Sequence, residues 1–400
     1  MARHYSIRNF FRQIPNALLA RYFADQGLFG DLDFEAMKDT KPDALFDAWL
    51  TLAQAQCKPM DAEFQDIFEL SCEKGFRAII DEARWQMQAT PEAVTDFIEI
   101  LSALPDHYHR AMVTYLDHGE CWKGATRFYH ADTLPYWRKR KNMGHKPAAV
   151  DDGSIQQLAI QILNYFHRTE GRGNNCVVEP FRRGELDYFF AYPEDYSQQE
   201  TEWINGEFER RPHTPAFEVI FVYSQKDGTL DLNFRGARKP MESLQRMFAT
   251  TILKLDELPP DPKDERVYDL NPLRQKGFDF VFAVGSGIEN VTVKKLRLSS
   301  RVKKGDRITL EADASHNADA IYILLHKIGK SIPLHQYNVT QVELSASIIV
   351  DTDKPAKPVT IRITHPNSCS LKYDEHDLKL RDMLESSGIE PKEPEEDKDT

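Results

Sequence analysis

The 400-residue chain contains no run of about 18 consecutive apolar residues, the length that a helix needs to cross a bilayer. Its first residues include Arg3, Arg8 and Arg12, but no long apolar block follows them, so a secretory signal is not expected. The five cysteines are scattered and form no Cys-x-x-Cys pair, a pattern typical of reduced thiols. These absences predict a cytoplasmic protein without a membrane span.

Catalytic and cofactor motifs are also missing from the sequence. It contains no Walker loop, no Gly-x-Ser-x-Gly and no recognisable Cys/His nucleophile pattern. The pairs Gly171-x-Gly173 and Gly285-x-Gly287 are too short to form phosphate loops, and neither begins a helix after a strand. We therefore predict no cofactor and favour a protein that is not an enzyme.

The composition is that of a folded protein with several domains. Hydrophobic residues make up 41% of the chain, which is ample for packed cores, and 400 residues exceed one typical core. The formal net charge of −12 argues against nucleic-acid binding over the whole surface, although it allows a local basic face.

The residue patterns predict a multidomain α+β protein. Apolar residues three and four apart, restarted at Pro15 and again after Thr90-Pro91, predict helices in the first third of the chain. Later segments alternate apolar and polar residues and are separated by turn residues, as strands are. The predicted parts are a helical domain at 1–145, a central α+β domain at 146–257, a β-rich domain at 266–376, and a short helix with an acidic disordered tail at 377–400.

The central domain is expected to contain an antiparallel sheet with helices on one face. Asp227-Gly228 lies between two apolar runs, and this dipeptide is a strong hairpin signal. The β-rich domain is expected to be a small sandwich of Ig-like shape. Its predicted strands are Phe278–Val284, Val291–Leu298, Arg307–Ala312, Val339–Val350 and Val359–Thr364.

Three carboxylates of the central sheet are the candidate catalytic residues: Glu179, Glu185 and Asp187, with Glu218 on a neighbouring strand. Carboxylates that converge across a sheet can hold Mg²⁺ and activate water, as in nucleases. The Glu-x-Lys pattern of restriction-type nucleases is missing after Glu218. Carboxylates are also common at solvent-exposed strand positions without any catalytic role, which is the other interpretation of these residues. A metal-dependent nuclease is therefore the alternative function.

The second candidate site is cationic and would bind a ligand. Arginine forks suit phosphate or carboxylate groups, and tyrosine rings can stack on bases. Ordinary pairing with nearby carboxylates is the alternative. The candidate ligand-binding residues are Arg168, Arg172, Arg182, Arg183, Arg210, Arg211, Tyr188 and Tyr192, with His167, His213, Trp203, Arg235, Arg238 and Lys239 close to them in the sequence.

Two weaker patterns are read as structural. The group His107, His109, His118, Cys121 and His130 does not have the tight pair spacing of a zinc site, so we predict no metal there. The basic run Trp137–Lys141 is interpreted as a solvated connector, with phosphate contact as the alternative.

The chain resembles uncharacterised bacterial proteins of genomic islands, some of them antiviral. The resemblance rests on Pro15–Leu19, Arg168–Gly173, Tyr188–Tyr196, Pro215–Glu218 and Asn367–Leu371. It implies an accessory or defence role but no fold, catalytic residue or cofactor. With the missing motifs, it favours a non-enzymatic sensor, binding or adaptor protein with a protein partner, and nucleic acid is the alternative partner.

Overall fold

The computed structural model describes residues 4–135, 137–204, 206–236, 239–260, 267–314, 317–349 and 355–390. Within these ranges the fold is mixed α+β, with twelve α-helices and three β-sheets, and the helical N-terminal region is confirmed. The chain divides into two compact units. The first comprises Met1–Thr133, Phe181–Glu185 and Tyr196–Pro215, and the second comprises Leu134–Pro180, Leu186–Asp195 and Ala216–Thr400.

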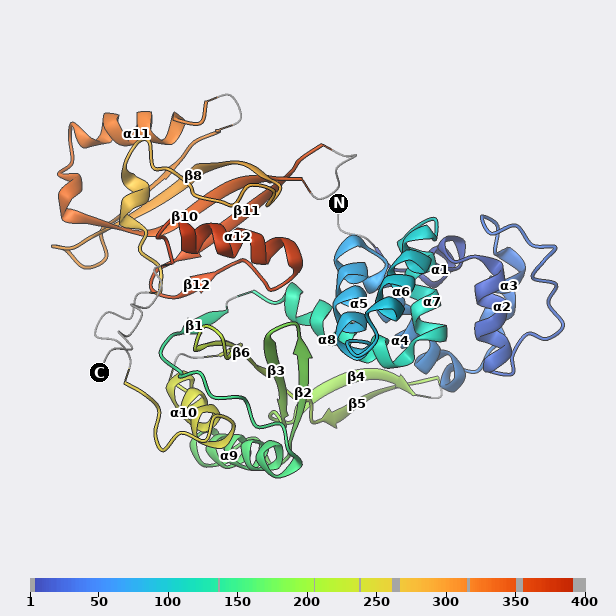
Figure 1. The fold of residues 1–400 in the computed structure, drawn as a ribbon. Helices are drawn as coiled ribbons and strands as arrows, with labels where there is room; N and C mark the ends of the chain where they lie inside the picture. The colour runs from blue at the N-terminus through green and yellow to red at the C-terminus, as the bar shows by residue number, and fades with distance from the viewer. Residues whose placement is uncertain are drawn as a thin grey trace. The chain divides into compact units, whose positions relative to one another are not determined.

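The first unit consists mainly of short helices. Pro15 separates the first two, as predicted, and Pro91 begins the sixth. The Asp106 carboxylate caps the seventh by accepting hydrogen bonds from the backbone N–H groups of Tyr108 and His109. These helices, in blue to cyan in Figure 1, are α1 Ile7–Gln13, α2 Asn16–Asp25, α3 Asp43–Leu50, α4 Gln54–Leu70, α5 Glu73–Gln86, α6 Pro91–Ala103, α7 His107–Asp117 and α8 Gly119–Thr133.

An aromatic cluster forms the core of α1 to α4. Phe64 of α4 is fully buried, and its ring centroid lies 4.8 Å from those of Phe10 and Tyr22. Phe11 and Phe23 meet the same ring edge to face, at 5.8 and 6.1 Å. Burying each such ring contributes roughly 1.5–3 kcal/mol, so this cluster is a main source of stability for the helices that supply it.

The first unit also contains a two-stranded ribbon, which is not among the elements predicted from the sequence. Strand β4 (Gln198–Ile204) pairs antiparallel with β5 (Glu207–His213), and most of their side chains are exposed. Trp203 and Phe208 face each other across the ribbon with ring centroids 5.5 Å apart, and both rings are more than half exposed. The ribbon therefore depends on cross-strand pairs instead of a buried core.

The second unit begins with the central five-stranded sheet, in the order β1-β7-β6-β3-β2. The Asp227-Gly228 turn joins β6 to β7, as predicted. The central strands β3, β6 and β7 are buried on both faces. Their bounds are β1 Arg138–Arg140, β2 Cys176–Arg183, β3 Leu186–Pro193, β6 Val219–Ser224 and β7 Thr229–Phe234.

Two helices cover one face of this sheet (Figure 1): α9, Asp152–Glu170, and α10, Met241–Thr251. Phe189 and Phe221 of the sheet meet Phe248 of α10, with ring centroids 5.2 and 5.1 Å apart. Helix α9 ends at Gly171, whose φ of 70° is a left-handed conformation that glycine adopts without strain. The predicted arrangement of an antiparallel sheet with helices on one face is present.

The C-terminal part contains a second five-stranded sheet, in the order β12-β11-β10-β8-β9, drawn in orange and red in Figure 1. Two helices, α11 and α12, add apolar side chains to the cluster on one of its faces. The elements are η1 Asn271–Arg274, β8 Ile288–Ser300, β9 Arg307–Glu311, α11 Ala320–Gly329, η2 Leu334–Gln336, β10 Tyr337–Ile348, β11 Lys357–Thr364, β12 Ser368–Cys369 and α12 Glu375–Ser386.

Two expectations for this region change. The predicted strand at Phe278–Val284 is wrong, because that segment is irregular: Phe278 and Phe280 pack on the core without a ladder partner. The described strands form one sheet covered by helices, so the Ig-like sandwich is not confirmed. The acidic tail is predicted to be disordered from Glu390 to Thr400, but Glu390 is buried and paired with Lys139. Residues 391–400 lie outside the described residues, as does most of the segment 258–264, which its prolines and charges predict to be a linker.

Buried polar pairs join the central sheet to the segment that follows β12. The Lys139 ammonium of β1 lies 2.8 Å from the Glu390 carboxylate, and both side chains are buried. The Tyr373 hydroxyl donates a hydrogen bond to Asp231 of β7. Arg381 of α12 donates hydrogen bonds to the carbonyl oxygens of Leu371 and Lys372. These contacts fix the C-terminal segment against the central sheet.

Among the described residues, none of the helices is both long and apolar enough to cross a bilayer.

The tight junction between α4 and α5 predicts a large effect of one methyl group. A Cβ atom at Gly75 would lie 2.1 Å from the carbonyl oxygen of Leu70, which is backbone and cannot rotate away. We expect Gly75→Ala to lower the free energy of unfolding of the first unit by about 1–3 kcal/mol. Urea denaturation followed by tryptophan fluorescence measures this, since four of the five tryptophans belong to the first unit.

The control for that change is Gly119→Ala, at the start of α8, where a Cβ would meet nothing within 4 Å. It should leave the urea midpoint nearly unchanged. Equal midpoints for the two variants would contradict the steric account of the α4–α5 junction.

A buried acid between α5 and α8 predicts a pH dependence. Glu82 is 1% exposed, and its Oε2 atom has no hydrogen-bond partner among the described residues. Burial raises the pKa of Glu82 above its ordinary value of 4.5. The stability that this group contributes is therefore greatest below pH 4.5 and is lost as the pH rises through the folded-state pKa.

Glu82→Gln removes this ionisation and keeps a hydrogen-bonding side chain of the same size. We expect the variant to gain stability relative to the wild type as the pH rises above about 4.5. Urea midpoints measured between pH 4 and 8 test this, and parallel pH profiles for the two proteins would refute it.

Candidate functional site

The hairpin of β8 and β9 is the most basic part of the chain. Residues 294–307 contain seven lysines and arginines and one acidic residue, in a protein whose formal net charge is −12. This charge is concentrated on two paired strands and their short connection. A local excess of cations in an acidic protein indicates a surface that attracts a negatively charged partner.

Strand alternation separates the hairpin into an apolar and a cationic face. Leu296, Leu298 and Leu310 are buried in the core under α11 and α12. Lys295, Arg297 and Ser299 alternate with these leucines along β8 and lie on the opposite face. In β9, Arg307 and Thr309 lie opposite Ser299 and Arg297. This solvent-facing side of β8 and β9 is called the outward face below.

Some cations near the outward face are already neutralised by carboxylates. The Lys295 ammonium lies 2.8 Å from Glu311 of β9. On β11, Arg362 lies 2.9 Å from Glu343 of β10. Each of these ion pairs is neutral overall and therefore offers no net charge to a ligand. Ion pairs at the surface also contribute little to the free energy of unfolding.

Arg297 and Arg307 differ from Lys295 and Arg362 in having no carboxylate partner in the described part of the chain. Among the residues that the structure describes, neither side chain has a carboxylate within ion-pair distance, and the buried Nε atom of Arg297 has no hydrogen-bond partner. Burial, and then the like charge of Arg307, lower the pKa of the Arg297 guanidinium. Two arginines that repel each other are costly to place together, and an anion bound to both guanidinium groups would offset the repulsion.

Hydroxyl groups surround this arginine pair. Thr309 lies opposite Arg297 in the ladder between β8 and β9, and Gln341 lies opposite it on β10. The Ser299 and Thr340 hydroxyls are 2.8 Å apart and hydrogen-bond to each other. Arginine forks flanked by hydroxyl and amide groups have the chemistry of a phosphate contact.

The predicted ligand-binding residues are divided between the two units. In the first unit, Arg183 is buried and lies 2.8 Å from Asp81 and 3.0 Å from Asp132. The Arg182 guanidinium lies 5.4 Å from the centroid of the Trp85 ring. Arg210 and Arg211 are exposed on the ribbon of β4 and β5, and Arg211 is 3.5 Å from Glu202.

In the second unit, Arg172 forms ion pairs with Glu170 and Asp195, at 2.8 and 2.7 Å, and lies 3.9 Å from the centroid of the Phe217 ring. Arg168 is exposed in the last turn of α9. Tyr188 is buried and Tyr192 half-buried in β3. Arg238 lies outside the described residues. A ligand site built from these residues stays a prediction.

The candidate catalytic carboxylates occupy different environments. Glu179 is half-buried in β2 and Asp187 buried in β3 of the second unit, whereas Glu185 is exposed and belongs to the first unit. Within the described parts of the chain, no three His, Cys, Asp or Glu side chains are placed to hold a metal ion, including the histidines near Cys121. All five cysteines are free thiols.

Arg297 and Arg307 are absent from the ligand-binding residues predicted from the sequence. The predicted strands cover both positions, but alternation alone does not single them out. The signal that identifies them is the local charge of residues 294–307 combined with strand alternation.

Three comparisons with known proteins do not assign the chain to a family. No protein-family model, no curated protein and no solved structure matches the chain. The function is therefore inferred from the geometry of the chain itself.

The surroundings of Arg183 predict that this residue stabilises the first unit. Arg183→Met would leave Asp81 and Asp132 without their buried partner, and we expect a loss of about 3–5 kcal/mol in the free energy of unfolding. The matched change Arg210→Met, on the exposed ribbon, should cost less than about 0.5 kcal/mol. Urea denaturation of both variants measures the difference, and similar losses would show that the buried ion pairs do not stabilise the fold.

Proposed function

We propose that the protein is a non-enzymatic binding protein that holds the phosphate backbone of a nucleic acid on the outward face of β8 and β9. The observation that carries this proposal is the pair Arg297 and Arg307: adjacent, cationic and without a carboxylate partner among the described residues. Most other buried or half-buried arginines and lysines described above have such a partner. A cation pair left open in this way is suited to an external anion.

The charge distribution favours a polymer of phosphates over a single small anion. Besides Arg297 and Arg307, the connection between the strands carries Arg301, Lys303 and Lys304, so cations extend along the hairpin. Lys303 is partly neutralised by Asp306, at 3.4 Å. Each phosphate neutralised releases counterions, and the affinity should therefore fall steeply with salt.

The outward face is suited to contacts with the phosphate backbone of a nucleic acid and not to recognition of its base sequence. The hairpin from 288 to 311 contains no aromatic residue to stack on bases. Its apolar side chain at the tip, Val302, is a single exposed residue, too small an area to anchor the hairpin in a membrane. Contacts from arginine, lysine and hydroxyl groups to phosphates fix position on a nucleic acid and carry no base information.

The test uses full-length protein and fluorescent 20-mers of single-stranded DNA, duplex DNA and RNA, with anisotropy measured across a salt series. We expect Arg297→Gln with Arg307→Gln to weaken binding at least tenfold and to reduce the salt slope by about 2, since each arginine removed leaves one phosphate without its cation. The variant should unfold at nearly the same urea concentration as the wild type, since Arg307 is exposed, Arg297 is half-buried and neither forms an ion pair among the described residues.

A control variant removes the same kind of charge elsewhere. Arg246→Gln, on the exposed side of α10 and paired with Glu242, should bind like the wild type. Binding that survives the substitution of Arg297 and Arg307, or no binding to any of the three probes, would overturn the proposal. Cleavage of a probe only when Mg²⁺ is present would instead support the nuclease alternative with Glu179, Glu185 and Asp187.

A further inference from the structure

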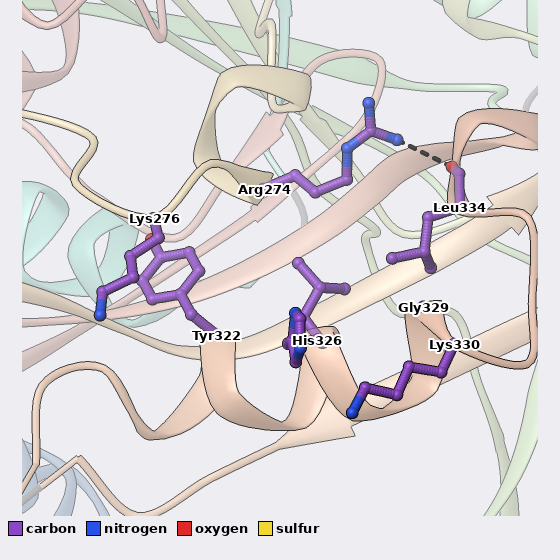
Figure 2. A pocket seen from close by; sticks show the side chains of 8 residues that line it. Arg274, Lys276, Tyr322, His326, Gly329, Lys330 and Leu334 are labelled. Carbon is purple, nitrogen blue, oxygen red and sulfur yellow. Dashed lines mark hydrogen bonds between the residues drawn. The ribbon is translucent and has the colours of Figure 1, made fainter.

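A separate cavity of about 410 Å³ lies beside α11 in the C-terminal part of the second unit. Figure 2 shows the side chains that line it: Arg274, Lys276, Tyr322, His326, Lys330 and Leu334, with Gly329 and Leu325. Its volume is in the range of sites that hold small organic molecules. Four of the lining side chains are basic, and none is acidic.

Two segments place these groups around one space. Tyr322, His326 and Lys330 are four residues apart and therefore lie along one side of α11 and its end. Arg274 ends η1, and Lys276 follows it, so the opposite wall comes from a segment about 50 residues earlier. The site therefore exists only in the folded C-terminal part.

The basic side chains of the lining differ in how many of their donors already have partners within the protein. One end of the Arg274 guanidinium is held by the carbonyl oxygens of Leu334 and Tyr337, at 2.9 and 3.1 Å, which orient it without neutralising its charge. The Lys276 ammonium pairs with Asp319 at 3.0 Å. Lys330 and His326 have no hydrogen-bond or ion-pair partner among the residues that the structure describes.

The dipole of α11 accounts for only part of this arrangement. Cations at the C-terminal end of a helix are favourable without any ligand, which explains Lys330 and also Lys327, outside the cavity. It does not explain Arg274, which comes from another segment, has no carboxylate partner among the described residues and adds to the repulsion at the same place. A bound anion offsets that repulsion.

The shape of the cavity also depends on Gly329. A Cβ at this position would lie 3.0 Å from Cδ1 of Leu334, so a larger residue would press on the leucine that lines the cavity. The Tyr322 ring forms the other apolar part of the lining, and its hydroxyl donates a hydrogen bond to the Leu273 carbonyl oxygen at 3.3 Å. A ligand with one anionic end and one flat apolar part matches both surfaces.

We propose that this cavity binds a small organic phosphate of about the size of a nucleotide. Its phosphate is held by His326 and Lys330 at the C-terminal end of α11, its ring lies against Tyr322, and Arg274 forms part of the wall across from them. This site is distinct from the outward face, because α11 packs on the buried side of the sheet, whereas Arg297 and Arg307 lie on the other side. The two proposals can therefore fail independently.

The test is isothermal titration of full-length protein with AMP, ATP and inorganic phosphate. We expect AMP or ATP to bind more tightly than inorganic phosphate, because only the nucleotides reach the tyrosine ring. The variant His326→Gln with Lys330→Gln should weaken nucleotide binding about tenfold or more, since it removes charge-assisted hydrogen bonds. The control Lys327→Gln changes the same charge on the same helix and should bind within about twofold of the wild type.

The proposal is overturned by no heat of binding with any of the three probes, by equal weakening by Lys327→Gln, or by wild-type affinity in the His326 and Lys330 variant. The Arg297 and Arg307 variant separates this site from nucleic-acid binding, because it should bind AMP or ATP like the wild type. If that variant no longer binds nucleotides, the nucleotides bind the outward face and not this cavity.

Discussion

The requirement that a buried charge be paired determines which cations of this protein hold the fold and which are available to a ligand. Arg183 is enclosed by Asp81 and Asp132 in the first unit, and Lys139 is paired with Glu390 in the second. Removing one partner of such a pair would leave an uncompensated charge in the interior, which is strongly destabilising. Arg297 is half-buried and has no carboxylate partner among the described residues: its Nε lacks a hydrogen-bond partner, and the like charge of Arg307 acts on it. A half-buried cation that lies beside a second cation and has no carboxylate partner is a candidate for function.

The architecture of the second unit explains how such a site is kept in place. The segment that follows β12 is anchored to the central sheet by buried polar pairs, and the core of the C-terminal sheet is filled from one side by α11 and α12. Its other side is thereby left to polar residues on a rigid ladder, where side chains have fixed spacing. A rigid strand pair holds two arginines at a defined separation better than a loop would, and this favours anion contact over random surface charge.

Much of the fold follows from local sequence signals, but the partners of the charged residues do not. Thr90-Pro91 and Asp227-Gly228 act within a few residues, so a helix start and a hairpin are readable from the chain. From its local sequence, Arg182-Arg183-Gly184 would also be interpreted as an exposed basic turn, and for Arg183 this interpretation is wrong. The burial of Arg183 depends on Asp81 and Asp132, which are 102 and 51 residues away from it, and no local pattern indicates such contacts. The ribbon of β4 and β5 is not predictable in the same way, because its polar sequence has no apolar face. Arg297 and Arg307 are predictable only by combining alternation with local charge.

Hydrogen–deuterium exchange of the full-length protein with and without a saturating DNA 20-mer tests the central claim most directly. It locates the contact without any substitution. The account predicts that DNA slows exchange in peptides covering residues 294–311, and that peptides from the ribbon at 198–213 and from the turn at 181–185 exchange as in the free protein. Protection confined to the ribbon, to that turn or to β3, with none in residues 294–311, would contradict it.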